Sequence, residues 1–267
     1  MLITSDTNQF IKLAKSLNEK KYRDKESLFL VEGLKLCLEA INSGFELKYL
    51  FYTEAANAAE LESVILSSAI AAREIKVFTI QEQLMKRISN TESPQPFLGI
   101  FAKRKLSKEL KLDQLNLYCE NIQDPGNLGA IIRTALATNC EKIFLDNCVD
   151  IYNPKLIRAS AGAVFHVDLM EMNLDKLLEL KAQDPFLPRL IASSPYAATS
   201  YLDYSLQSKD EKLILMLGNE ANGLSERAFQ AADLSLNIPI NPKLESLNVL
   251  AATTVLLFHF KNLLLLK

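Results

Sequence analysis

The sequence predicts an α/β protein of two domains, in which a small mixed sheet with helices precedes a larger domain with a mostly parallel sheet. Short apolar runs, typical of strands, alternate with helical patterns along all 267 residues. The runs in the second half are continuously apolar, as in parallel strands covered on both faces. A charged stretch at 104–114 has no apolar periodicity. We therefore expect domains at 1–103 and 115–267, joined by that linker.

The first domain is expected to alternate strands with helices and to close on a strand, which is the pattern of a small mixed sheet. A basic helical segment at 12–25 precedes these elements and carries six Lys and Arg residues against Glu19 and Asp24. Strands are expected at 28–33, 46–54, 74–80 and 96–103, and helices at 34–44, 58–70 and 81–89.

The second domain repeats the alternation. Strands are expected at 115–120, 142–147, 189–194, 212–218 and 234–240, and helices at 128–139, 174–182, 225–232 and 247–264. A parallel sheet of this kind binds ligands at the carboxyl ends of its strands. The glycine-bearing loops at these ends are therefore the candidate site.

Composition favours a soluble cytoplasmic protein. Hydrophobic residues make up 49% of the chain and charged residues 23%, which is ordinary for a globular protein. The four cysteines are scattered, without a CxxC pattern or a Cys/His cluster, so we expect buried thiols in a reducing cytosol and no metal. The start lacks the pattern of a signal peptide. Polar residues interrupt the apolar C-terminal run, so we expect a core or interface helix there and no membrane span.

The distribution of charge is compatible with a nucleic-acid partner, although the net charge is only −2. Basic residues gather at 12–25 and again in "KRKLSKELK" at 103–111. Such local patches suit a polyanion held by one end of the protein. A solvated helix face and a solvated linker would explain the same residues.

The first candidate loop is "NIQDPGNLGAIIRTALATN" at 121–139. We expect Gly126 to permit a tight turn, and Asn127 and Gly129 to stand at the start of a helix, where free backbone N–H groups favour an anion. Arg133 follows nearly two turns later and is expected on roughly the same face as Asn127. The pattern is neither a dinucleotide fingerprint nor a P-loop.

Two further loops carry polar residues at strand ends. In "LMLGNEANGLS", Gly218 ends a strand, Asn219 and Glu220 follow, and Ser225 is the expected cap of the next helix. In "NIPINPKLESLNVLAATTVLL", a strand is expected to end at 238–239 and a long helix to begin near Ser246. Hydroxyl and amide side chains at a helix start are commonly only caps.

Together the three loops resemble the signature motifs of the SpoU-type 2′-O-ribose RNA methyltransferases of the SPOUT superfamily. The matching stretches are "NxxxPxNLGAIIRTA", "LGNEANGLS" and "IPI…ESLNVLAAT", in this order. The likeness extends over about 115–264, including "RASAGAVFHV", and "FLVEGLKLCLEA" resembles the accessory RNA-binding domain of the family. The resemblance implies a trefoil-knotted catalytic domain, S-adenosylmethionine as methyl donor, an RNA substrate and a homodimer.

The resemblance also implies residue roles. The donor is expected against Gly218, Ile238 and Leu247, largely through backbone groups, with Asn219 and Pro239 adjacent. The polar positions around the reacting ribose correspond to Asn127, Arg133, Glu220, Ser246 and Asn248.

The expected reaction is methyl transfer to a ribose 2′-hydroxyl, an in-line displacement that depends on positioning. We expect Arg133 to hold a phosphate rather than to act as a base, because a guanidinium stays protonated in proteins. Ribosomal RNA is favoured over transfer RNA, given the additional N-terminal domain. Two alternatives remain: a non-catalytic RNA-binding or ribosome-assembly protein, and a methyltransferase acting on a base nitrogen.

Overall fold

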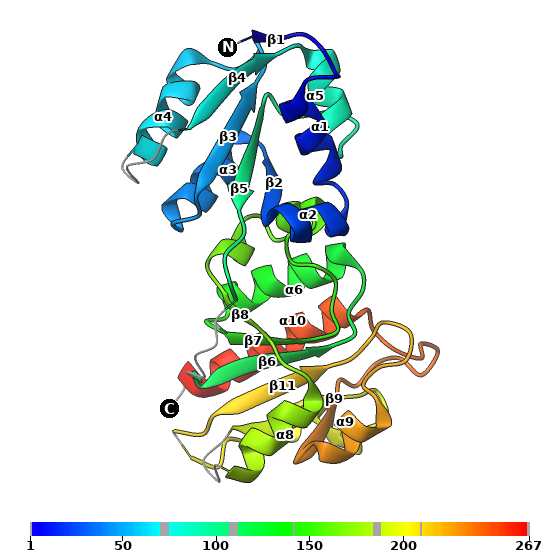
Figure 1. Cartoon of the computed structure of the whole chain (residues 1–267). Helices are drawn as coiled ribbons and strands as arrows, with labels where there is room; N and C mark the ends of the chain where they lie inside the picture. The colour runs from blue at the N-terminus through cyan, green and yellow to red at the C-terminus, as the bar shows by residue number, and fades with distance from the viewer. Residues whose placement is uncertain are drawn as a thin grey trace. The chain divides into compact units, whose positions relative to one another are not determined.

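The computed structural model describes residues 2–69, 75–106, 112–140, 142–183, 188–208 and 210–265. The chain divides into two compact units (Figure 1). The N-terminal unit contains residues 1–105 and also the segment 150–165, and the C-terminal unit contains 106–149 and 166–267. Position 70 of a predicted helix, position 74 of a predicted strand and 107–111 of the predicted linker lie outside the described residues.

The N-terminal unit is built on the predicted mixed sheet, which the structure confirms. Its five strands follow the order β1-β4-β3-β5-β2. Strand β5 is antiparallel to both β2 and β3, whereas β4 is parallel to β1 and β3. The strands are β1 (Leu2–Ile3), β2 (Leu28–Glu32), β3 (Leu47–Tyr52), β4 (Lys76–Ile80) and β5 (Phe97–Ala102).

Helices cover both faces of this sheet (Figure 1). The helices are α1 (Gln9–Ser16), α2 (Lys20–Glu26), α3 (Leu34–Asn42), α4 (Ala58–Ala69), α5 (Glu82–Ile88) and α7 (Pro154–Ala159). Helices α1 and α5 enclose a core with Phe51, Phe78 and Ile100 of the strands. The predicted basic helical segment is interrupted, because it spans two helices, α1 and α2, with residues 17–19 between them.

The segment 150–165 belongs to the N-terminal unit, although the chain reaches it from a strand of the C-terminal sheet. Asp150 forms a buried ion pair with Arg23 at 2.7 Å. Arg23 also donates to the backbone carbonyls of Leu17 and Asn18, both at 2.8 Å. The ring of Tyr152 lies 4.6 Å from that of Phe29. A buried charge pair with its remaining donors satisfied resists separation strongly, so this segment is anchored in the N-terminal unit.

The C-terminal unit contains a seven-stranded sheet of order β10-β12-β9-β11-β6-β7-β8. All six neighbouring pairs are parallel, which confirms the predicted parallel sheet. The strands are β6 (Leu115–Glu120), β7 (Lys142–Asp146), β8 (Asp168–Glu171), β9 (Arg189–Ser193), β10 (Thr199–Ser200), β11 (Leu213–Leu217) and β12 (Leu234–Asn237). Their carboxyl ends therefore meet at one edge of the sheet. The short strands β8 and β10 were not predicted.

Helices α8 (Leu174–Gln183) and α9 (Glu226–Ala231) cover one face of this sheet, and α6 (Pro125–Ala137) and α10 (Val249–Leu265) cover the other (Figure 1). The 3-10 turns are η1 (Ala163–Phe165), in the N-terminal unit, and η2 (Tyr201–Asp203). Helix α10 buries Leu256, Leu257 and Phe260. None of the helices in the described part of the chain is long and apolar enough to cross a membrane.

Three predicted boundaries next to the three loops were wrong. Helix α6 begins at Pro125, three residues earlier than expected, because Asp124 caps it by accepting from the Asn127 N–H at 2.8 Å. Gly126 is therefore helical and forms no tight turn. Strand β12 ends at Asn237, before Pro239, which has no N–H for a ladder. Helix α10 begins at Val249 rather than near Ser246.

Gly218, at the end of β11, is in close contact with the backbone of the same loop. A Cβ atom at this position would lie 2.0 Å from the Gly223 carbonyl carbon and 2.0 Å from the Leu224 nitrogen. Gly223 itself has a φ of +69° and open space where its Cβ would be. Gly218 is required because a side chain would collide with the neighbouring backbone, and Gly223 because its backbone is in the left-handed conformation.

The two glycines give a matched test. Gly218→Ala forces backbone apart, so we expect a loss of about 3 kcal/mol or more, equivalent to a Tm about 6–12 °C lower. Gly223→Ala incurs only the left-handed strain, about 1–2 kcal/mol. Thermal unfolding followed by circular dichroism measures both. An equal loss in the two variants would contradict the close contact at Gly218.

Candidate active site

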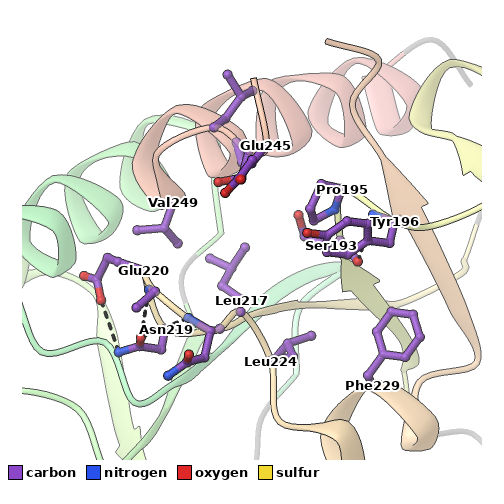
Figure 2. Close-up of a pocket in the computed structure, with 18 of the residues that line it drawn as sticks. Ser193, Pro195, Tyr196, Leu217, Asn219, Glu220, Leu224, Phe229, Glu245 and Val249 are labelled. Atoms are coloured by element: carbon purple, nitrogen blue, oxygen red, sulfur yellow. Dashed lines mark hydrogen bonds between the residues drawn. The ribbon is translucent and has the colours of Figure 1, made fainter. Parts of the chain in front are cut away.

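A cavity of about 500 Å³ opens at the carboxyl ends of β9, β11 and β12, next to the start of α10. Its walls come from the ends of these strands, the loops that follow them, and helices α9 and α10 (Figure 2). One part is apolar and contains Leu217, Leu224, Phe229, Ile238 and Val249. This size is within the usual range for small-molecule sites.

The loop after β11 is closed by Asn219. Its backbone exchanges hydrogen bonds with Gly223, at 2.9 and 2.8 Å. Its side-chain Oδ1 accepts from the Ala221 N–H at 2.8 Å, and its Nδ2 donates to the Asn121 carbonyl at 2.9 Å. Both polar atoms of the Asn219 side chain are thus engaged within the protein. Asn219 therefore contributes to ligand binding mainly by holding the loop that forms the cavity wall.

Asn121 supports this loop from the end of β6, a role that the sequence analysis did not assign. Its φ is +54°, a left-handed conformation that asparagine tolerates better than most residues. Its Oδ1 accepts from Gln123 at 3.0 Å and from Asn147 at 3.1 Å. Asn121 is the first residue of the "NxxxPxNLG" motif, but its position in the motif did not predict which residues it contacts.

Three of the predicted polar residues form one hydrogen-bonded chain. Asn248 donates to the side-chain oxygen of Asn127 at 3.4 Å, and Asn127 donates to Glu220 at 3.1 Å. Asn248 also caps α10 by accepting from the Leu250 N–H at 2.9 Å. The chain joins the first, second and third loops at one place. It leaves Glu220 as an oriented carboxylate acceptor beside the cavity.

Arg133 lies on the exposed side of α6 and forms no hydrogen bond or ion pair with another described residue. The expectation of a face shared with Asn127 was wrong. Two residues six positions apart in a helix are separated by about 9 Å along its axis and point about 120° apart around it. Arg133 instead follows Gly129 and Ala130 by one turn, and helical side chains lean toward the N-terminus. These small residues leave room for the guanidinium to extend toward the start of α6.

The structure places the predicted donor and ribose residues unevenly around the cavity. Six of them line it: Gly218, Asn219, Glu220, Ile238, Ser246 and Leu247. Asn127 and Asn248 are joined to this group through Glu220. Pro239 and Arg133 are not among the lining residues, although Ile240 is. Sequence reasoning also missed Ser193, at the end of β9, and Tyr196, in the loop that follows, both of which line the cavity.

The cavity is suited to a cationic ligand with an apolar part. Its described lining contains Glu220, Glu226 and Glu245 but no Lys or Arg. S-adenosylmethionine carries a sulfonium and an ammonium group against one carboxylate, together with a flat adenine ring. The acidic and apolar parts of the wall, with the backbone around Gly218, fit this donor.

Comparison with known proteins identifies the family. The family described as "SpoU rRNA Methylase family" matches residues 114–258, and the "MRM3-like substrate binding domain" matches 8–99. A Bacillus subtilis protein named 23S rRNA (guanosine(2553)-2'-O)-methyltransferase RlmP is 31% identical over 97% of this chain and 99% of its own. A mitochondrial rRNA methyltransferase 3 of Xenopus laevis is 28% identical over 96% of this chain and 73% of its own.

Solved structures agree with this grouping. The crystal structure of an AdoMet-bound rRNA methyltransferase from Sinorhizobium meliloti superposes with a TM-score of 0.87 at 28% identity, covering 98% of this chain and 97% of that one. With a family match over more than half its length and motif residues assembled around one cavity, the chain belongs to the SpoU rRNA methylase family.

Proposed function

We propose that this protein transfers the methyl group of S-adenosylmethionine to a ribose 2′-hydroxyl in RNA, with ribosomal RNA as the favoured substrate. The observation that carries the proposal is the chain of hydrogen bonds from Asn248 through Asn127 to Glu220, beside a cavity that fits the donor. The Bacillus subtilis and Xenopus laevis relatives, which match nearly the whole chain, are named rRNA methyltransferases, and this favours ribosomal over transfer RNA.

The donor residues are proposed on the basis of their position in the cavity wall. Gly218, Ile238 and Leu247 all line the cavity, and their backbone groups suit the adenosine and methionine parts of the donor. Asn219 acts by closing its loop, and Pro239 by ending β12 so that the following residues turn toward the cavity. When bound, the donor supplies an electrophilic methyl group on sulfur.

The protein's own contribution to the transfer is orientation and handling of charge. Glu220, held by Asn127, can accept a hydrogen bond from the ribose hydroxyl and receive its proton as the oxygen becomes nucleophilic. Ser246 lines the same cavity and can hold the sugar or relay the proton. The proposed handling of the proton uses only side chains that line the cavity.

Arg133 is proposed to bind the phosphate next to the reacting ribose. Its exposure and the absence of a partner among the described residues leave all its donors available to RNA. A planar guanidinium binds a phosphate through two parallel hydrogen bonds, which fixes orientation as well as charge. Its positive charge would also stabilise the developing alkoxide.

The N-terminal unit is proposed as the RNA-binding domain. Lys12, Lys15, Lys20 and Lys21 are all exposed, although Lys21 pairs with Glu19 at 3.0 Å. The second basic run contributes less than its composition suggested. Lys103 pairs with Asp24 at 2.6 Å, and this hydrogen bond lowers the pKa of Asp24.

Arg104 of that run is also engaged within the protein. Its Nη2 donates to the Ser43 carbonyl at 2.9 Å, and its guanidinium stacks on the Phe45 ring. Residues 107–111 of the run lie outside the described residues. The proposed RNA surface of this unit therefore rests mainly on α1 and α2.

We further propose a reducing compartment, the cytosol, as the location. All four cysteines are free thiols. Burial raises the pKa of Cys37 and of Cys148 to about 12, so these thiols are unreactive at neutral pH. These features suit a protein that never needs disulfides.

Two alternatives differ in what they require of the site. A non-catalytic RNA-binding protein would need neither an oriented Glu220 nor a donor-sized cavity, and both are present. Methylation of a base nitrogen would leave a methyl group on the base. Comparing 2′-O-methyl sites in ribosomal and transfer RNA from cells with and without the protein distinguishes ribosomal RNA, transfer RNA and absence of activity.

The role of Arg133 gives a kinetic prediction. Because Arg133 is outside the cavity lining, Arg133→Ala should leave donor affinity within about twofold of the parent and lower the single-turnover rate by roughly a hundredfold, about 2.7 kcal/mol. Arg133→Lys keeps the charge but loses the planar fork, so little rescue indicates a phosphate clamp. The control is Arg227→Ala, which removes an exposed arginine paired with Asp175. A parental rate in Arg133→Ala would exclude this role.

The homodimer is proposed to form through the outer face of α10. This helix leaves Phe258 44% exposed and Leu265 68% exposed, and Leu202 of the adjacent turn is 64% exposed. Tyr201, next to Leu202, contacts His259 of α10 with ring centroids 4.9 Å apart, which places these residues on neighbouring surfaces. Exposed apolar residues gathered in this way typically mark an interface.

The dimer proposal predicts that Phe258→Asp produces monomers in sedimentation velocity experiments, because a carboxylate would be buried without a partner. Leu66→Asp, at a position of α4 that is 58% exposed, is the matched control and should not change the assembly. A parent protein that sediments as a monomer at micromolar concentration would refute the proposal.

A further inference from the structure

The cavity wall contains the carboxylates of Glu220, Glu226 and Glu245. They differ in how strongly neighbouring protein groups stabilise their negative charge. Glu220 accepts hydrogen bonds from Asn127 at 3.1 Å and from Asn219 at 3.4 Å. Glu226 accepts from Gln230 at 3.0 Å and stands in the first turn of α9, where the helix dipole favours a negative charge. Both are therefore partly compensated by the protein.

Glu245 is different. It forms no hydrogen bond and no ion pair with any other described residue. It belongs to the loop that leads into α10, and Figure 2 shows its side chain on the cavity side of that loop. The described lining offers no Lys or Arg to balance it. Its negative charge is therefore not offset by any residue of the described lining, although the side chain is also exposed to solvent.

We propose that Glu245 is a specificity-determining residue that makes the cavity prefer the charged methyl donor over its neutral demethylated product. This inference rests on the proposed function. S-adenosylmethionine has a net positive charge, because its sulfonium adds to an otherwise balanced amino acid. S-adenosylhomocysteine has lost that charge with the methyl group and is neutral overall. Both molecules keep the ammonium and carboxylate groups of the amino acid, so a carboxylate without a partner attracts the donor more strongly than the product by its interaction with the sulfonium charge.

The consequence concerns turnover. Transfer of the methyl group removes the attraction to Glu245 at the moment when the product must leave. Binding interactions that both forms share, the backbone around Gly218 and the apolar wall, give affinity without discrimination. The charge of Glu245 supplies the difference between the two affinities, and because Glu245 is exposed, this difference is reduced by salt.

The test compares Glu245→Gln with the parent by isothermal titration calorimetry in the full-length protein. The probes are S-adenosylmethionine, S-adenosylhomocysteine and sinefungin, an analogue with an ammonium group near the position of the sulfonium. We expect the variant to bind the two cationic probes about three- to tenfold more weakly and the neutral product within about twofold of the parent. In the parent, this preference should shrink between about 0.05 M and about 0.5 M salt.

Lys243→Gln is the matched control, because it changes a charge two residues away that is not among the cavity-lining residues. It should not alter the ratio of the two affinities. Equal effects of Glu245→Gln on donor and product, or no effect on either, would overturn the inference while leaving the proposed function intact. Failure of the parent to bind any of the three probes would overturn both.

Discussion

The contact between Gly218 and the backbone of residues 223 and 224 is the constraint on which the site depends. It lets the loop after β11 fold back at the end of a buried strand, with no side chain between the two backbone segments. Once folded, the loop is closed by Asn219 and joined to β6 through the Asn121 carbonyl. The same fold directs Glu220 toward Asn127. A larger residue at 218 would therefore disturb the cavity wall and the polar chain together.

The site separates two kinds of charge. The cavity that fits the donor is acidic, with no basic residue in its described lining, whereas Arg133 lies outside it on the exposed side of α6. This arrangement matches a reaction between a cation and a polyanion, because each partner has its own region of complementary charge. Asn127, in the helix that carries Arg133, is hydrogen-bonded to Glu220 of the cavity wall and to Asn248.

The sequence predicted the strand and helix alternation and the residues of the three loops, because apolar periodicity and glycine placement are local signals. It failed where contacts between distant segments decide the structure. The role of Asn121 depends on loops more than twenty residues away. The start of α6 is a different case, because the Asp124 cap is local, three residues before Asn127, and Asp followed by Pro is a pattern typical of a helix start. Periodicity also did not place segment 150–165 with the N-terminal unit, because its anchors are Arg23 and Phe29.

The central claim is that the three loops form one site for methyl transfer to ribose, and coupling between Asn127 and Glu220 tests it most directly. The substrate is the RNA that the comparison of 2′-O-methyl sites identifies. Single-turnover methylation of this RNA would be measured for Asn127→Ala, Glu220→Gln and the double variant, followed by nucleoside analysis of the product. The account predicts a 2′-O-methylated nucleoside and a double variant little slower than the slower single variant, because the two side chains act as one unit. Additive losses, or a methyl group on the base, would contradict it.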